Sequence, residues 1–329
     1  MKFSDYFESW LHQNYYKRGV KIGKKGDFYT SVSIGSFFGI CIAKHILQIC
    51  ENFQICESQK IDIIEIGANE GYLLCDIIQA LFTFNKNKFK IFNFNIIEPH
   101  ENLRQIQKNN FYEKFGNDVK INHFSNLQNV KFENVIFISN ELFDSFKCEV
   151  VDGDKMLFIE NEKPVFKKID DDEIYKFMQK FKISKGEIPL SYFEFAKQIC
   201  ESANNLYFIT FDYGEMKPRN DFSLRIYKNH NVYNFFEIKN FSDFFGQSDI
   251  TYNVNFSILK DAFESNKAKF IELKTQKRAL IDFGATEILE LFLQKGGKKV
   301  YNNAVLEFKH LINEFDEKFK MIKFKKGIL

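Results

Sequence analysis

Residues 61–78, IDIIEIGANEGYLLCDII, join an apolar run, an acid, two glycines four positions apart and an amphipathic segment without a break. A strand that leads through a glycine turn directly into a helix is how nucleotide-binding α/β domains begin. The helical segment places apolar residues at a spacing that predicts one buried face. These residues are Leu73, Leu74, Ile77, Ile78, Leu81 and Phe82.

The turn itself has the form E-x-G-x-x-x-G, carried by Glu65, Gly67 and Gly71. It is close to the E-x-G-x-G-x-G turn with which many methyltransferases hold S-adenosylmethionine, but Asn69 stands in place of the middle glycine. Asparagine adopts positive φ at little cost, so a tight turn is still expected. A strand-turn-helix that binds no ligand is the alternative interpretation.

A second apolar run, at residues 89–99, predicts another strand, and this strand ends in Glu98. An acid at this place commonly accepts hydrogen bonds from ribose hydroxyls, although a solvated strand end has the same pattern. Residues 101–111 then predict a helix, and residues 119–124 and 134–144 predict two further strands. Asn140 and Glu141 fall where the last of these strands should open toward a ligand crevice.

Composition narrows the class of protein. The chain has 329 residues and a mass of 39.0 kDa, and the absence of a Pro- or Gly-rich linker indicates one large core with insertions. Its net charge of +2 gives no electrostatic reason to expect binding of nucleic acid. Six cysteines without C-x-x-C spacing and six scattered histidines predict reduced core thiols and no metal site. The first 16 residues have neither signal- nor transit-peptide character, and residues 31–50 predict a buried helix. We therefore expect a cytoplasmic protein without membrane insertion.

Six motifs, in order and at compatible spacing, resemble those of the MidA family of class I S-adenosylmethionine-dependent methyltransferases. The first three are Gly26–Ser31 for G-D-F-x-T-[AS]-P-E-I-S, Glu65–Gly71 for E-L-G-P-G-x-G, and Glu98-Pro99 with Leu103 and Gln107 for V-E-P-S-x-x-L-x-x-x-Q. The others are Asn140–Asp144 for N-E-x-x-D-A-x-P-V, Asp212-Tyr213-Gly214 with Leu224, Arg225 and Tyr227 for D-Y-G and L-R-x-Y/F, and 249–256 for D-L-T-x-x-V-D-F. Departures lie at Ala68 and Asn69, at Val32 and Ser33, and at residues 145–147.

The resemblance implies a class I methyltransferase fold, an α/β Rossmann-like sheet with helices on both faces, with insertions that form a smaller substrate-side subdomain. It implies S-adenosyl-L-methionine as cofactor, and mitochondrial members of the family are complex I assembly factors that act as protein arginine methyltransferases. The cofactor-binding residues expected are Glu65, Gly67, Ala68, Asn69, Gly71, Glu98, Pro99, Asn140, Gly26 and Thr30.

The same resemblance divides the chain into four parts: residues 1–35 as an N-terminal segment with a lid loop over the crevice, 36–148 as the cofactor-binding half of the core, 149–195 as an insertion, and 196–329 as the remainder. Within the insertion, residues 158–168 predict a hairpin and residues 169–183 a helix with a solvated acidic start. The C-terminal KFKMIKFKKG, residues 318–327, alternates lysines with apolar residues and predicts an edge strand.

Acids are expected on the acceptor side, because an arginine acceptor keeps its proton and must lose it as the new N–C bond forms. Glu141 is the first candidate for this role, followed by Asp144 and Asp27. Alternatively, Glu141 orders the loop around the methionine moiety and Asp144 caps the next helix.

Three functions stay open on the sequence: an arginine methyltransferase that acts on a protein substrate such as a respiratory-complex subunit, a small-molecule methyltransferase, and a non-catalytic assembly protein on the same fold. A homodimer is also left open.

Overall fold

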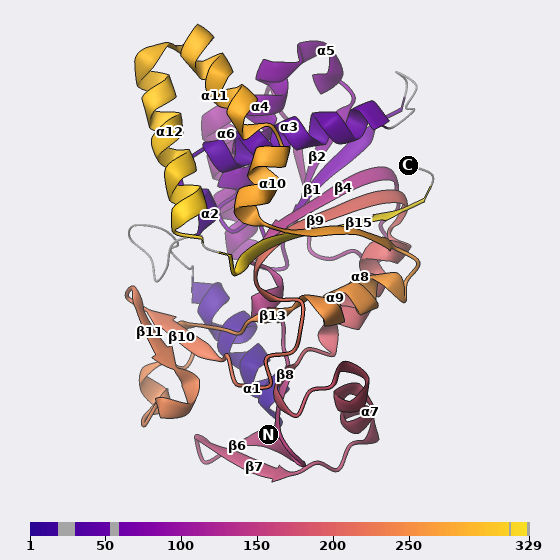
Figure 1. Ribbon diagram of the computed structural model, residues 1–329, viewed down its shortest axis with the longest axis vertical. Helices are drawn as coiled ribbons and strands as arrows, with labels where there is room; N and C mark the ends of the chain where they lie inside the picture. Colours follow the sequence, from indigo (N-terminus) through magenta and orange to yellow (C-terminus); the bar gives the residue numbers. More distant parts are fainter. Residues whose placement is uncertain (19–29, 53–58, 316, 328–329) are drawn as a thin grey trace. The chain divides into compact units, whose positions relative to one another are not determined.

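Figure 1 shows the computed structural model of the chain, which describes residues 1–18, 30–52, 59–315 and 317–327. The chain forms two compact units. Unit 1 comprises residues 1–29, 141–197 and 212–266, and unit 2 comprises residues 30–140, 198–211 and 267–329. Gly26, Asp27 and Cys56 lie outside the described residues, as does most of the predicted lid loop. The four-part division expected from the sequence stays a prediction.

Unit 2 is built on a mostly parallel sheet flanked by helices, as the sequence predicts (Figure 1). Its strand order is β14-β15-β9-β4-β1-β2-β3, and β1 lies in register between two parallel neighbours, with Ile63 opposite both Phe94 and Ile136. Burial on both faces explains the nearly continuous apolar runs. The strands are β1 Ile61–Ile66, β2 Phe92–Ile97, β3 Ile121–Phe124, β4 Phe132–Asn140, β9 Ala203–Glu215, β14 Lys269–Thr275 and β15 Phe319–Lys326.

The helices of unit 2 pack on one another as well as on the sheet. They are α2 Ser31–Ile34, α3 Phe37–Asn52, α4 Tyr72–Phe84, α5 Lys86–Phe89, α6 Glu101–Phe115, α10 Gln276–Asp282, α11 Ala285–Leu291 and α12 Gly297–Asn313, with a π-helical segment at Phe292–Gly296. The predicted buried helix at residues 31–50 is thus two helices. At Gly39 in α3, an added Cβ would lie 2.7 Å from the Cβ of Asp76 in α4, so this glycine permits the close approach of the two helices.

Helix α4 buries the predicted stripe, with one exception. Leu73, Leu74, Ile77, Ile78 and Leu81 are at most 2% exposed, whereas Phe82 is 45% exposed. Phe82 instead makes an edge contact with Phe89 of α5, the rings 5.4 Å apart. The helix therefore buries the predicted face except at Phe82, and it also buries Cys75 and Ala80.

The prediction that the C-terminal strand lies at the edge of the sheet is wrong. Strand β15 lies between β14 and β9, so it is an inner strand, and β14 is the edge. Its lysines do not mark an exposed edge: Lys323 is 8% exposed and pairs with Glu272 of β14, 2.5 Å between Nζ and Oε1. An ion pair with the neighbouring strand allows a lysine to lie inside the sheet. The alternation of lysines and apolar residues therefore does not distinguish an inner strand from an edge strand.

Unit 1 holds two small antiparallel sheets, β7-β6-β5-β8 and β11-β10-β12. The predicted hairpin and helix of the insertion are confirmed by β6, β7 and α7, and Asp171 caps α7 by accepting from Ile174 N at 3.4 Å. The strands are β5 Glu149–Asp152, β6 Lys155–Glu160, β7 Lys163–Lys168, β8 Lys185–Ile188, β10 Arg225–Lys228, β11 Asn231–Asn234, β12 Asp249–Thr251 and β13 Val254–Asn255. Its helices are α1 Phe3–Glu8, α7 Asp172–Phe181 and α9 Phe256–Glu264, together with most of α8 Ser191–Glu201. Short helical segments complete it at Ser9–Tyr15, Tyr16–Arg18, Phe143–Ser145, Phe235–Glu237 and Phe241–Asp243.

The first residues of the chain are part of the unit 1 core. Trp10 is completely buried and its indole N–H donates to Ser248 O at 2.7 Å. Ser4 Oγ donates to Glu149 at 2.6 Å, which attaches α1 to β5. Rings of this segment also pack on other aromatic rings of unit 1, with centroids 5.4 Å apart for Phe3 and Phe235 and 5.5 Å apart for Trp10 and Phe245. The N-terminal segment therefore stabilises this unit.

The five cysteines within the described residues are buried and form no disulfide bond, in agreement with the predicted reduced thiols. Across residues 1–18, 30–52, 59–315 and 317–327, no helix combines the length and the apolar character needed to cross a membrane.

Candidate active site

The turn after β1 adopts the conformation that the sequence predicts. Gly67, Asn69 and Gly71 all have positive φ, at 69°, 46° and 84°, and Gly71 N donates to Ala68 O at 2.7 Å. Asn69 thus occupies the left-handed region in place of the missing glycine. Gly67 is exposed between buried Ile66 and Ala68, so the turn presents bare backbone at the surface. We refer to residues 65–71 as the cofactor turn.

The side chain of Glu65 supports the start of helix α4, directly after this turn. Its carboxylate accepts from Leu74 N at 3.0 Å and so satisfies an unpaired donor in the first turn of α4, where no side chain of the helix itself provides a cap. Burial raises the pKa of Glu65 to about 8, against the lowering effect of that hydrogen bond. Its observed role is to fix the helix start, and binding of a cofactor by Glu65 stays a prediction.

Glu98 follows directly after β2. Its Oε1 accepts from His100 N at 2.9 Å, and burial raises its pKa to about 7. Arg104 Nη1 donates to the backbone oxygens of Glu98 and Pro99, at 2.6 and 2.9 Å, and holds the chain at the start of α6. Glu98 is thus held in a fixed position, and the oxygens of its carboxyl can accept hydroxyl hydrogen bonds.

Helix α6 links Glu98 to the cofactor turn through residues that the sequence did not single out as site residues. Gln107 Nε2 donates to Asn69 O at 2.7 Å, and the same side chain hydrogen-bonds the carboxyl of Glu98. Asn110 Nδ2 donates to Glu70 O at 2.9 Å. For Gln107 the available signal was its position in the resembled motif, and Asn110 follows it at helical spacing. The contacts explain how a turn with only two glycines keeps its shape.

Thr30, predicted as a cofactor residue, caps α2. Its Oγ1 accepts from Ser33 N at 3.3 Å, while Thr30 N donates to Ser33 Oγ at 3.0 Å. This reciprocal pair is a capping box, in which glutamate commonly takes the place that Ser33 has here. The departure from Pro-Glu at Val32 and Ser33 therefore preserves the local structure.

In unit 1, the segment that follows β4 forms a tight turn at residues 141–145. Glu141 has φ of 52°, which is uncommon for a non-glycine residue and costs about 1 kcal/mol or more. Asp212 holds this turn: its Oδ2 accepts from Leu142 N at 3.1 Å and from Phe143 N at 2.8 Å. The D-Y-G aspartate is therefore the partner that keeps Glu141 in its strained conformation.

Asp144 lies among charged and aromatic groups of the same unit. Burial raises the pKa of Asp144, while Arg225 lowers it, and burial next to Asp144 raises the pKa of Asp212. The guanidinium of Arg225 stacks over the ring of Tyr213, 4.6 Å from its centroid, and its Nε donates to Tyr227 OH at 2.9 Å. We call Asp144, Asp212 and Arg225 the carboxylate cluster: the two buried acids interact with each other, and the charge of Arg225 acts on Asp144.

The structure thus collects the predicted residues into two groups. Unit 2 contains Glu65–Gly71, Glu98, Pro99, Thr30 and Asn140, the last residue of β4. Unit 1 contains Glu141 and Asp144 and adds Asp212 and Arg225, which the sequence quoted in motifs without assigning a role. His12 of unit 1 lies next to the turn at residues 141–145, because its ring forms a hydrogen bond with the backbone of Ser145. Burial lowers the pKa of His12.

Comparison with known proteins identifies a family for this chain. A family model described as "Putative S-adenosyl-L-methionine-dependent methyltransferase" matches residues 41–273, which include the cofactor turn, Glu98 and the carboxylate cluster. Among curated proteins, none matches the sequence.

Two solved structures from Burkholderia thailandensis share the fold. A COG1565 superfamily member bound to S-adenosyl-homocysteine is 21% identical, with a TM-score of 0.83, and the alignment covers 100% of this chain and 88% of that chain. The native structure of an uncharacterized COG1565 superfamily protein is 19% identical, with a TM-score of 0.80 and the same coverage of 100% and 88%. At these identities the likeness is one of fold.

Proposed function

This chain belongs to the family of S-adenosyl-L-methionine-dependent methyltransferases, and we propose that it methylates arginine on a protein substrate. S-adenosylmethionine is its cofactor, which agrees with the family and with a neighbouring fold that binds S-adenosyl-homocysteine. The observation that carries the cofactor assignment here is the cofactor turn, whose exposed Gly67 and left-handed Asn69 leave backbone accessible. The six motifs quoted above support the finer placement in the MidA family.

The residues of the chain suit this cofactor. Glu98 would accept from the ribose hydroxyls, and the backbone of Gly67 and Ala68 would line the amino-acid part. When bound, the cofactor supplies a methyl group already activated by a positive sulfonium. The protein therefore has to align the acceptor, and alignment alone can provide a large part of the rate.

The arginine assignment is supported by the acids of unit 1. A guanidinium remains protonated at neutral pH, so a carboxylate must hold the planar cation and take up one proton from the nitrogen that is methylated. Glu141 is suited to this, because it is partly exposed and held by Asp212, whereas Asp144 and Asp212 are buried. The proton taken up by Glu141 would pass to water.

A labelling experiment tests the proposed function. The purified protein is incubated with methyl-labelled S-adenosylmethionine and a lysate from cells that lack it, and labelled polypeptides are hydrolysed to identify methylated residues. Methylarginine in a discrete polypeptide is the expected result. Label confined to the low-mass fraction would select a small-molecule methyltransferase, and cofactor binding without any transfer would select an assembly protein.

We expect Glu141→Gln to lower turnover about a hundredfold, since a general base typically contributes 10²–10⁴-fold. Affinity for S-adenosylhomocysteine should change by less than about twofold, because the amide keeps the size of the side chain. Turnover by initial rates and affinity by calorimetry check this. Glu133→Gln, which removes an exposed acid of β4, is the matched control. An equal loss of affinity and turnover would return Glu141 to a cofactor role.

Binding of S-adenosylhomocysteine should strengthen as pH rises. Burial raises the pKa of Glu98 to about 7, and ribose hydroxyls donate to its ionised form, so bound ligand favours loss of the proton. If only the ionised form binds, affinity falls about tenfold from pH 8 to pH 6. Calorimetry over this range measures the slope, and Glu98→Gln should remove it. A slope that persists in Glu98→Gln would assign it to another group, such as Glu65.

A further inference from the structure

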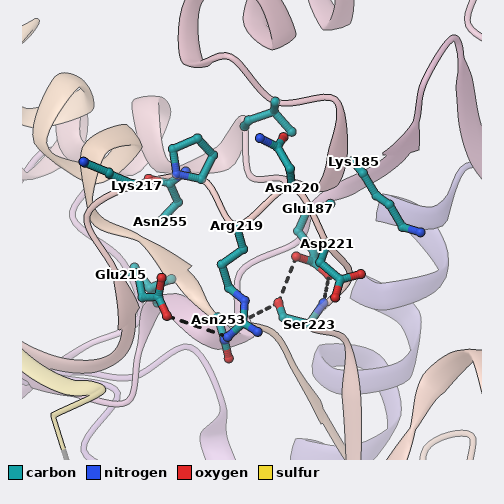
Figure 2. Close-up of a pocket in the computed structure, with 14 residues that line it drawn as sticks. Lys185, Glu187, Glu215, Lys217, Arg219, Asn220, Asp221, Ser223, Asn253 and Asn255 are labelled. Carbon is teal, nitrogen blue, oxygen red and sulfur yellow. Dashed lines mark hydrogen bonds and ion pairs between the residues drawn. The ribbon is translucent and has the colours of Figure 1, made fainter.

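Unit 1 contains a polar pocket that includes none of the residues discussed so far as cofactor or catalytic groups (Figure 2). The pocket opens to solvent, and the empty space in and above it, open solvent included, is about 380 Å³. The lining comes from β8, from the end of β9 with the loop that follows it, and from residues 253–255. All of these segments belong to unit 1, so the pocket is formed within one compact unit.

Three asparagines in the lining have their amide orientation fixed by partners that can only donate. Asn220 Oδ1 accepts from Ser184 N at 2.8 Å, and Asn255 Oδ1 accepts from Ser257 N at 3.0 Å. Asn253 Oδ1 accepts from the guanidinium of Arg225, the first residue of β10. Each oxygen is therefore committed to the protein. Within the described residues the three NH₂ groups have no protein partner, so they are left as donors.

The cations of the pocket are also weakly engaged. Arg219 makes a single ion pair, 3.8 Å from Glu215, which is beyond hydrogen-bonding distance, and its side chain is 38% exposed. Figure 2 shows Arg219 extending between Glu215 and Ser223, whereas the amino groups of Lys217 and Lys185 point away. An exposed ion pair of this length contributes little to the free energy of folding, so the N–H donors of Arg219 are available to a ligand.

Two acids of the pocket already accept hydrogen bonds from the protein, whereas the carboxylate of Glu215, within the part of the chain that the structure describes, makes only the long ion pair with Arg219. Glu187 is partly exposed and accepts three hydrogen bonds, from Ser223 N at 2.7 Å, Ser223 Oγ at 2.9 Å and Leu224 N at 3.1 Å. Asp221 accepts from Phe222 N at 2.8 Å. The pocket therefore offers more free donors than free acceptors, and a ligand rich in acceptors completes it.

We propose that this pocket binds a carboxylate. A planar monoanion can accept from the guanidinium of Arg219 and from the nearby amides at once. The three acids in the lining would repel a phosphate dianion more strongly, which favours the single charge. Two sources share this chemistry: an acidic residue or C-terminus of a polypeptide, and a free small carboxylic acid. Binding here is independent of methyl transfer, so it can succeed or fail separately from the arginine assignment.

The test uses the full chain and follows the backbone and side-chain amide signals of ¹⁵N-labelled protein. The probes are an N-acetylated, C-amidated Gly-Asp-Gly peptide, the matching Gly-Asn-Gly peptide, propionate and inorganic phosphate. We expect the aspartate peptide or propionate to shift the side-chain signals of Asn253 and Asn255. Arg219→Gln should weaken this binding about tenfold, the usual effect of losing one charge-assisted contact.

The matched control is Lys176→Gln, which removes one exposed positive charge from α7 of the same unit and should leave binding unchanged. Tighter binding of the peptide than of propionate would identify a polypeptide as the source, and the reverse would identify a small acid. Equal binding of the aspartate and asparagine peptides, preferential binding of phosphate, or an Arg219→Gln variant that binds normally would each overturn the proposal.

Discussion

Gly214→Ala is expected to lose about 3 kcal/mol or more of the free energy of unfolding. Gly214 lies in β9 opposite Val254 of β13, and the two strands are parallel there. An added Cβ would lie 2.7 Å from the carbonyl carbon of Val254 and 2.8 Å from its nitrogen, and closer still to its carbonyl oxygen. These atoms are backbone, so neither a rotamer change nor a small adjustment relieves the clash.

Urea denaturation followed by circular dichroism measures the loss. Gly116→Ala is the comparison, since nothing lies within 4 Å of the Cβ position and only the positive φ of 57° resists the methyl group. That variant should lose about 1 kcal/mol. A Gly214→Ala protein as stable as Gly116→Ala would show that β13 moves away readily, and would contradict the rigid pairing.

The Gly214 position also explains the D-Y-G motif physically. Asp212 holds the turn at 141–145, Tyr213 supports the guanidinium of Arg225, and Gly214 lets β13 approach. Asp212 belongs to the carboxylate cluster, and Tyr213 and Gly214 hold the segments around it. We expect substitution of any of them to act on activity through the position of Glu141.

Local patterns were sufficient for much of the fold. The strand-turn-helix at residues 61–84, the strand that ends before Glu98 and the hairpin at β6 and β7 follow from apolar periodicity and turn residues. The same patterns failed at β15. Its alternating lysines predicted an edge strand, but β15 pairs with β14 and lies inside the sheet, because pairing between distant segments is not visible in the local pattern.

The site was predicted unevenly for a related reason. Positive φ at Asn69 follows from the chemistry of asparagine, whereas the hydrogen bond from Gln107 that holds it joins residues 38 positions apart. Likewise, Asp212 reaches the 141–145 turn across 69 residues. Single-sequence reasoning identifies which side chains can bind or donate, but only the fold decides which of them meet.

The cofactor turn provides the second large expected effect: Gly67→Val should abolish binding of S-adenosylhomocysteine. Gly67 has φ of 69°, and a β-branched residue is strained there, so part of the effect could be conformational. Gly67→Asn separates the two causes, because asparagine accepts this φ, as Asn69 does, but still adds a side chain. If the ligand needs bare backbone, Gly67→Asn also binds at least about a hundredfold more weakly.

Calorimetry with S-adenosylhomocysteine measures both variants, and thermal unfolding verifies that each is folded. Asn69→Gly is the matched control, since it restores the third glycine of the turn and should bind at least as well as the natural chain. Normal affinity in Gly67→Asn with weak affinity in Gly67→Val would mean that the turn needs only its conformation. Normal affinity in both would remove Gly67 from the cofactor site, and the methyl donor would then have to be held through Glu98 and groups outside the turn.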